Sequence, residues 1–273
     1  MRGIAGTRRV GHLGTLDPMA TGVLPLMINQ ATRLARFWDH SEKIYESVVR
    51  FGSSTTTYDR EGDVVGEAVA IAIPAHQIEA CLATFRGEIL QTPPPVSAKK
   101  IGGVPAYKLV RQNKPVDLEP VPVSVYELRL ESVEGDRARI FVRCSAGTYV
   151  RSIAHDLGQL VGCGAHLDSL VRVRSGPFTL EQARTLDELQ LRKNEDRLAE
   201  ALIGPADLLL EFPRAFVDDV TARQIRQGRD FSVSPFRVPE GAEYVKAMGP
   251  DGTLVAIGKI ILPGLYHPMV VMP

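Results

Sequence analysis

The sequence predicts an α+β fold: a mixed, mainly antiparallel sheet flanked by helices over residues 1–212, then a small β-rich domain over residues 213–273. Apolar residues alternate along neighbouring segments such as 121–130 and 138–144, which a short turn at 134–136 connects as a hairpin. Other stretches carry apolar residues at the 3.6-residue spacing of helices. These patterns together predict an α+β protein of two domains.

In the first half, residues 23–28 form an apolar run that predicts a short buried strand, and 31–38 have helical spacing. Residues 44–51 alternate, so Tyr45, Ser47, Val49 and Phe51 should share one face of a strand. A helix is predicted over 74–85, begun by its proline and ended at Gly87. Its expected buried residues are Ile78, Cys81, Leu82 and Phe85.

Residues 144–167 predict a strand end, a turn at Gly147 and an amphipathic helix. The expected buried face is Val150, Ile153, Ala154, Leu157, Leu160 and Val161. Arg151 falls in the first turn, where the helix dipole disfavours a cation, so an anionic partner would explain its placement. Asp17 is the candidate for that partner.

The last third begins with a charged helical stretch over 180–201. A short helix at 221–227 and two strands at 244–248 and 254–257 follow, the strands joined by G-P-D-G-T. Asp-Gly between apolar runs is a strong hairpin signal. This tail is therefore expected to be rich in β structure.

Composition narrows the class of protein. The 273 residues hold 32 Lys plus Arg and 32 Asp plus Glu, so the net charge is zero. No apolar run is long enough to cross a membrane, and the first residues have no secretory signal, so a cytoplasmic protein without membrane partners is expected. The three cysteines are widely spaced and predict neither disulfides nor a zinc site.

Asp17 is the one carboxylate in residues 11–26, a stretch otherwise made of glycine, proline, threonine, apolar residues and one histidine. Glycines and prolines specify the backbone closely, and Pro18 biases Asp17 toward extended or turn backbone. The loop should therefore present an isolated carboxylate. A plain turn residue before proline is the alternative interpretation.

The string G-H-x-G-x-L-D-P-x-A-T-G-x-L in this loop resembles the catalytic loop of the pseudouridine synthases, specifically the bacterial TruB family that acts on uridine 55 of tRNA. Residues 52–62 match G-x-x-T-x-T-x-D-x-x-G, and 91–100 match Q-x-P-x-x-[YF]-S-A-x-K with Val96 in place of the aromatic. The tail resembles a PUA-like RNA-binding domain. The family normally has a strand and a K-P-x-G-x-[TS]-S loop before the catalytic loop, and this sequence is expected to lack both.

The resemblance implies a pseudouridine synthase fold and isomerisation of uridine to pseudouridine in the T arm of tRNA, without cofactor or metal. Asp17 is implied as the essential group, attacking sugar or base or removing a ribose proton. Arg151 would hold it ionised. Tyr45 would stack on the flipped uracil and assist removal of the C5 proton, while His12, Tyr149 and Leu170 would bind the base or neighbouring nucleotides.

Plainer roles stay open: a loop hydrogen bond for His12, a core strand position for Tyr45 and a surface ion pair for Arg151. A tRNA-binding or tRNA-folding factor without catalysis is a rival function, and a hydrolase using Asp17 is a more distant one. No protein partner is implied, and a monomer is expected. RNA affinity would come from local basic patches, each of which could equally be a solvated face. The candidate patches are Arg8 and Arg9; Arg33 and Arg36; Lys99, Lys100, Lys108, Arg111 and Lys114; Arg172 and Arg174; and Arg223, Arg226 and Arg229.

Overall fold

The computed structural model describes residues 1–69, 71–112, 114–234, 236, 238–239 and 241–273. The chain forms two compact units. The larger unit contains residues 12–25 and 38–183, and the smaller unit contains residues 1–11, 26–37 and 184–273. The predicted domain boundary between residues 212 and 213 stays a prediction.

The larger unit is built on a seven-stranded sheet in the order β13-β12-β4-β11-β10-β7, with β2 added to β12. Neighbours in this order pair antiparallel, whereas β2 pairs parallel with β12, so the sheet is mixed and mainly antiparallel as predicted. Its strands are β2 (Thr21–Gly22), β4 (Lys43–Phe51), β7 (Gly87–Gln91), β10 (Val121–Glu134), β11 (Arg137–Cys144), β12 (Ala165–Ser175) and β13 (Phe178–Thr179).

Strand β4 lies at the centre and shows the predicted alternation. Tyr45, Ser47, Val49 and Phe51 are buried, and Lys43 extends the same buried face by one position. The predicted hairpin is also present, because β10 and β11 pair from Glu134 opposite Arg137 toward Val125 opposite Cys144. Strand β12 has no counterpart among the predicted elements.

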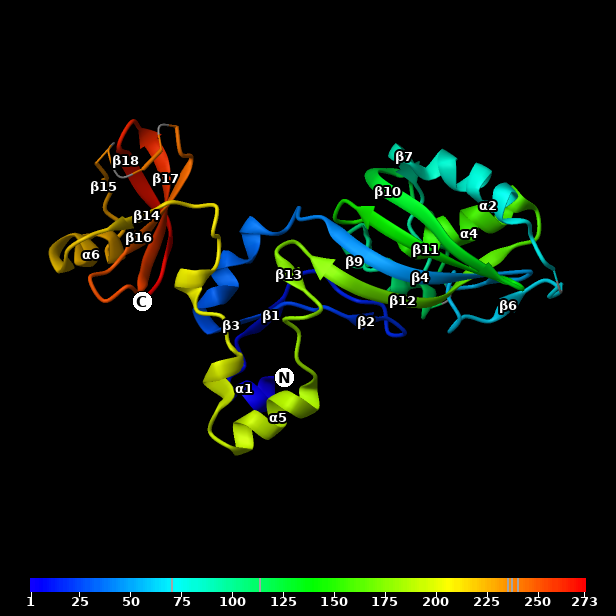
Figure 1. The fold of residues 1–273 in the computed structure, drawn as a ribbon, viewed down its shortest axis with the longest axis horizontal. Coiled ribbons are helices and arrows are strands. Elements are labelled where there is room, and N and C mark those ends of the chain that lie inside the picture. The colour runs from blue at the N-terminus through cyan, green and yellow to red at the C-terminus, as the bar shows by residue number, and fades with distance from the viewer. Residues whose placement is uncertain (70, 113, 235, 237, 240) are drawn as a thin grey trace. The chain divides into compact units, whose positions relative to one another are not determined.

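Two helices cover one face of this sheet: α4 (Val150–Val161) packs on β12, α2 (Ala75–Leu82) packs on β10, and they pack on each other (Figure 1). A 3-10 turn, η2 (Ala83–Phe85), completes the helix predicted over 74–85. Helix α4 ends at Gly162 with φ of 86°, a left-handed cap that glycine adopts without strain. The prediction that Leu160 is buried was wrong, since it lies 56% exposed near the end of α4.

Short elements complete the larger unit. Strands β5 (Ser54–Thr55) and β6 (Val64–Val65) pair with each other, and so do β8 (Lys100–Ile101) and β9 (Val104–Pro105). Helix α3 (Ala106–Val110) follows β9. The core joins the sheet to α2 and α4.

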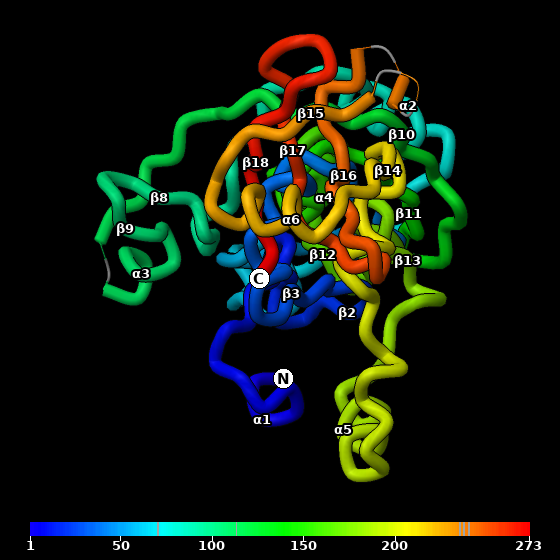
Figure 2. Tube along the Cα trace, turned by 90° about the vertical axis from the view of Figure 1, so that its left-hand side faces the viewer, coloured from blue at the N-terminus to red at the C-terminus, as the bar shows by residue number. Residues whose placement is uncertain are grey.

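The smaller unit has a five-stranded sheet in the order β14-β16-β17-β18-β15, with α6 (Asp219–Arg226) packed against β17 and β18 (Figure 2). The strands are β14 (Arg214–Phe216), β15 (Phe231–Ser232), β16 (Tyr244–Met248), β17 (Leu254–Leu262) and β18 (Leu265–Val271). Strands β16 and β17 form the hairpin predicted from Asp-Gly. This sheet lies wholly within the predicted β-rich tail.

The remaining elements are α1 (Arg2–Ala5), β1 (Val10–His12), β3 (Leu26–Ile28), η1 (Asn29–Phe37), α5 (Leu186–Asn194), η3 (Leu198–Ala201) and η4 (Pro205–Asp207). Strand β3 is shorter than the predicted 23–28, and the predicted helix over 31–38 is the 3-10 helix η1. Across the described residues, no helix combines the length and the apolar character needed to span a bilayer.

Candidate active site

Asp17 lies on the turn between β1 and β2. Its backbone carbonyl accepts a hydrogen bond from the Ala20 amide at 2.9 Å, which closes the turn next to Pro18. The carboxylate side chain is 26% exposed. The loop therefore presents Asp17 partly to solvent while fixing its backbone.

Arg151, in the first turn of α4, makes the predicted contact with Asp17. Its Nε donates to Oδ2 at 2.9 Å and its Nη2 donates to Oδ1 at 2.6 Å. This two-point geometry fixes the plane of the carboxylate as well as its distance. Because the arginine side chain is only 5% exposed, water screens its attraction to the carboxylate only weakly.

The third nitrogen of Arg151 is held by the loops on its other side. Nη1 donates to the Thr57 carbonyl at 3.0 Å and to the Val96 carbonyl at 3.1 Å. It also lies 3.5 Å from Oδ2 of Asp59, whose side chain is 5% exposed. One guanidinium thus serves two carboxylates, one buried and one open to solvent.

Asp59 is itself fixed within its loop. Its Oδ1 accepts hydrogen bonds from the Thr57 hydroxyl at 2.6 Å and the Glu61 amide at 3.0 Å. The Thr55 hydroxyl donates to its backbone carbonyl at 2.6 Å. The segment 52–62, which matches the second family motif, therefore buries a carboxylate whose remaining oxygen faces Arg151.

Tyr45 is buried on β4 near this network. Burial raises the pKa of Tyr45 to about 12, and the charge of Asp17 adds to the rise while Arg172 opposes it. A phenol with this pKa is neutral at pH 7. Tyr45 can therefore offer a flat ring or a hydrogen-bond donor, but hardly any phenolate.

Tyr149 stands directly before α4 as its N-cap. Gln91, the last residue of β7, accepts from the Tyr149 amide at 2.8 Å and donates to its carbonyl at 3.0 Å. Burial raises the pKa of Tyr149, which the charge of Asp17 also raises and that of Arg151 lowers. Tyr149 thus lies within electrostatic reach of the ion pair.

Leu170 and His12 differ in their setting. Leu170 is buried on β12 opposite Ser47 of β4, two positions from the residue opposite Tyr45. His12 is exposed at the end of β1, and in the described part of the chain it forms no hydrogen bond or ion pair with Asp17, Tyr45 or Arg151. An ion pair joins Asp17 to Arg151, and the charge of Asp17 acts on Tyr45 and Tyr149. Leu170 lies on the strand paired with that of Tyr45, and His12 lies outside these contacts.

Two family models together match residues 2–211. Residues 2–150 match the N-terminal domain of the TruB family of pseudouridylate synthases, and residues 151–211 match the C-terminal domain of tRNA pseudouridylate synthase B. The chain belongs to the TruB family. Its members are isomerases, and the first of these two domains contains the Asp17 loop, Tyr45 and Asp59.

Curated relatives are similar over most of their length. A tRNA pseudouridine synthase B from Solibacter usitatus is 58% identical over all of this chain and 93% of the relative. A protein of the same name from Stutzerimonas stutzeri is 40% identical, covering 98% of this chain and 88% of the relative. These identities place this TruB-family chain well within the range where fold and general chemistry are shared.

Solved structures confirm the predicted pseudouridine synthase fold. A chain from an H/ACA ribonucleoprotein bound to a substrate RNA containing 2'-deoxyuridine aligns with a TM-score of 0.69 and 23% identity, covering all of this chain and 79% of the other. A chain from an archaeal box H/ACA Nop10-Cbf5 complex aligns with a TM-score of 0.68, also at 23% identity, covering 80% of that chain.

Sequence reasoning missed three residues around this TruB-family site. Asp59 matched a family position without being given a role, although a buried loop carboxylate needs a cation. Gln91 begins the motif over 91–100, and nothing in that motif predicts its two hydrogen bonds to the Tyr149 backbone. The prediction that Arg172 and Arg174 form a basic surface patch, as an RNA contact or as a solvated face, was wrong because Arg172 is only 1% exposed.

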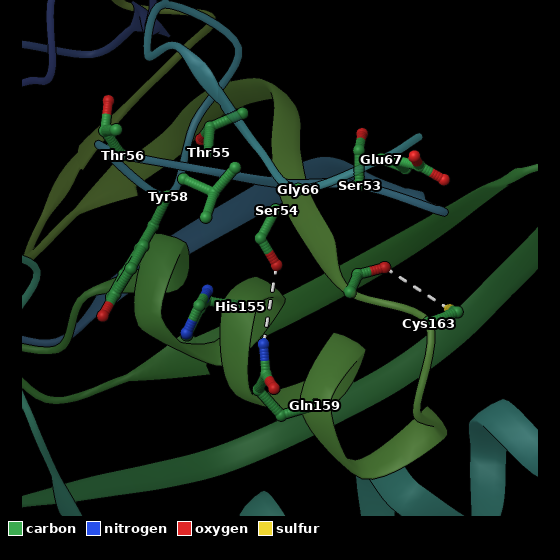
Figure 3. Close-up of a pocket in the computed structure, with 12 residues that line it drawn as sticks. Ser53, Ser54, Thr55, Thr56, Tyr58, Gly66, Glu67, His155, Gln159 and Cys163 are labelled. Atoms are coloured by element: carbon green, nitrogen blue, oxygen red, sulfur yellow. Dashed lines mark hydrogen bonds between the residues drawn. The ribbon is translucent and has the colours of Figure 1, made fainter. Parts of the chain in front are cut away.

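A separate groove of about 450 Å³ runs beside α4 (Figure 3). Tyr58 stacks on His155 with ring centroids 3.7 Å apart, and Gln159 donates to the Ser54 hydroxyl at 3.5 Å. The groove is lined by Ser53, Ser54, Thr55, Thr56, Tyr58, Val65, Gly66, Glu67, His155, Gln159, Cys163 and Gly164. None of the six predicted site residues lines it.

Proposed function

We propose that this TruB-family protein isomerises uridine to pseudouridine at position 55 in the T loop of tRNA, with Asp17 as the essential catalytic carboxylate. The observation that carries the proposal is the two-point contact between a partly exposed Asp17 and a buried Arg151. The names of the curated relatives supply the substrate class.

The reaction needs no redox partner. The bond between C1′ and N1 of the uridine breaks, the uracil turns, and C1′ joins C5. The proton on C5 leaves to solvent and N1 gains one, so atoms and electrons balance. Attack on sugar or base and removal of a ribose proton all require an ionised Asp17, and the Arg151 guanidinium donates to both of its carboxylate oxygens.

Three residues fit a role in holding the everted base. Tyr45 supplies an aromatic face, and its raised pKa of about 12 favours stacking over proton removal because phenolate is scarce at neutral pH. Leu170 adds an apolar wall from the neighbouring strand, and Tyr149 adds a second ring beside Asp17. His12, exposed on β1, would contact neighbouring nucleotides.

The proposal extends to the rest of the chain. Residues 213–273 would form the PUA-like RNA-binding domain, and in the smaller unit Arg33 and Arg36 line a basic groove with Met269, Val270 and Val271. Arg33 donates to the Val271 carbonyl at 2.8 Å, which fixes one of these cations. The protein would act as a monomer in the cytoplasm.

A tritium-release assay on unmodified tRNA labelled at C5 of uridine tests this function. Asp17→Asn should abolish release while tRNA binding persists, because the amide keeps the shape and loses the charge. The matched control is Asp136→Asn, since Asp136 also pairs with an arginine, Arg50, but on the surface. The control should release tritium like wild type.

Two further results decide the details. Transfer RNA with cytidine at position 55 should release no tritium, whereas continued release would place the reaction at another uridine. Tight tRNA binding by the wild type without any release would instead identify a tRNA-binding factor.

A further inference from the structure

Arg172 is a fully buried arginine on β12, one strand away from Tyr45. It is 1% exposed, and its Cα partner across the antiparallel pair with β4 is Tyr45. Within the part of the chain that the structure describes, it forms no salt bridge with a carboxylate. A buried charge of this kind is costly unless hydrogen bonds satisfy it.

The guanidinium donates its hydrogen bonds to backbone carbonyls of the loop that carries Asp17. Nη2 donates to the Gly14 carbonyl at 3.0 Å, and Nη1 donates to the Thr15 carbonyl at 3.4 Å. Nε donates to the Val23 carbonyl at 2.7 Å. The three acceptors lie on both sides of Asp17 in the sequence, so one side chain ties together the two arms of the loop.

The backbone of Arg172 holds the same loop. Its carbonyl accepts from the Val23 amide at 2.8 Å, within the parallel pairing of β2 and β12. Gly22 has φ of 98°, and a Cβ there would lie 2.3 Å from the Arg172 carbonyl oxygen. Loop and strand therefore approach too closely for any other residue at position 22.

Arg172 also acts on Tyr45. Its charge and hydrogen bonding lower the pKa of the Tyr45 phenol against the larger effect of burial. Lys43, on the same buried face of β4, has its pKa lowered by burial and then by Arg172. One guanidinium thus contacts the loop of Asp17 and influences the ring expected to hold the base.

We propose that Arg172 is a positioning residue for the isomerisation, setting the Asp17 loop in register with Tyr45. The inference depends on the proposed role of Asp17. Arg172 touches no reacting atom, and its effect passes through the backbone carbonyls of Gly14, Thr15 and Val23. Misplacing a reacting group by about 1 Å can cost about 100-fold in rate.

The test uses the full chain with Arg172→Lys and Arg172→Met. Lysine keeps the charge but cannot reach all three carbonyls from one nitrogen, and methionine keeps only the apolar stem. The matched control is Lys246→Met in the smaller unit. Lys246 is equally buried at 1% exposure and donates only to backbone carbonyls, those of Ala206 at 3.2 Å and Leu208 at 2.9 Å.

Single-turnover tritium release at saturating tRNA, tRNA affinity and amide hydrogen exchange of residues 12–25 are then compared. We expect both Arg172 variants to slow release about 100-fold with affinity unchanged, and to speed exchange in residues 12–25. If Arg172→Met does not fold, Arg172→Lys decides alone.

Three outcomes would overturn the inference: release slowed no more than in Lys246→Met, equal losses in release and affinity, or exchange in the loop unchanged. Failure of the proposed function is distinguished by Asp17→Asn. If Asp17→Asn still releases tritium, the role of Asp17 is wrong. If it does not, while Arg172→Lys releases like wild type, only the positioning role fails.

Discussion

Arg151 and His155 lie one turn apart on α4, yet their surroundings are opposite. Arg151 has a partner for each of its three nitrogens, including both oxygens of Asp17. His155 borders the groove, where it stacks on Tyr58, and its Nδ1 is buried without a hydrogen-bond partner among the described residues. Burial alone lowers the pKa of His155.

The difference teaches where chemistry can be supported. A reacting group needs neighbours that fix its geometry and its charge, and Asp17, the proposed reacting group, has such a neighbour in Arg151. The groove has a volume of about 450 Å³, but its one charged lining residue is Glu67 and its ring pair is held by stacking. A hollow of this size therefore does not by itself mark a reactive site.

Arg151→Lys should have the largest effect on this comparison. An ammonium cannot bind both oxygens of Asp17 in plane and also donate to Thr57 and Val96. Turnover measured by tritium release should fall about 100-fold, with tRNA affinity unchanged. The control is Arg50→Lys at the surface pair with Asp136. Equal losses of turnover and affinity would make Arg151 a phosphate contact instead.

Asp156→Asn should raise the stability of the protein by an amount that depends on pH. Burial raises the pKa of Asp156 to about 6. The folded state therefore binds more protons than the unfolded state between about pH 4 and 6, and stability falls as pH rises through that window. The variant should be up to about 2 kcal/mol more stable than wild type at pH 8, and equal to it at pH 4.

Urea denaturation at the two pH values measures this difference. The control is Asp168→Asn, because Asp168 is 21% exposed and lies 3.8 Å from Arg137. It should gain no stability at pH 8. The difference in unfolding free energy between Asp156→Asn and wild type should be larger at pH 8 than at pH 4. An equal difference at the two pH values would contradict a buried carboxylate at position 156.

Tyr58→Phe should have the smallest effect. The substitution keeps the ring that stacks on His155 and removes only a hydroxyl, for which the structure records no hydrogen bond among the described residues. Turnover and tRNA affinity should both stay at the wild-type level. A tenfold loss of turnover would bring the groove into the reaction and remove the contrast between the two sides of α4.

The sequence allowed the ion pair to be predicted because two local signals converged on it. A rigid loop presented one carboxylate, Asp17, and a helix began with one unexplained cation, Arg151. Strand β4 could be predicted in the same way, from the alternation of apolar and polar residues along it. In each case the pattern was local, so no knowledge of distant packing was needed.

Strand β12 could not be read in the same way. Its pairing with β4 shifts register between Leu167 and Ser169 and again between Arg172 and Arg174, which breaks the period of two. Its buried face also contains an arginine, which sequence patterns assign to the surface. The role of Arg172 depends on three carbonyls about 150 residues away in the chain, and no periodicity encodes such contacts.

The pairing of strand β12 also limits where the chain can gain or lose a residue. It pairs on one side with β4 and on the other with β2, so it sets the spacing of Leu170 and Arg172 against Tyr45 and Gly22 together. Deleting or inserting one codon within residues 170–172 would turn these side chains to the opposite face of the sheet. Insertions and deletions should be tolerated in the exposed turn at Gly135, whereas selection should remove them from β12.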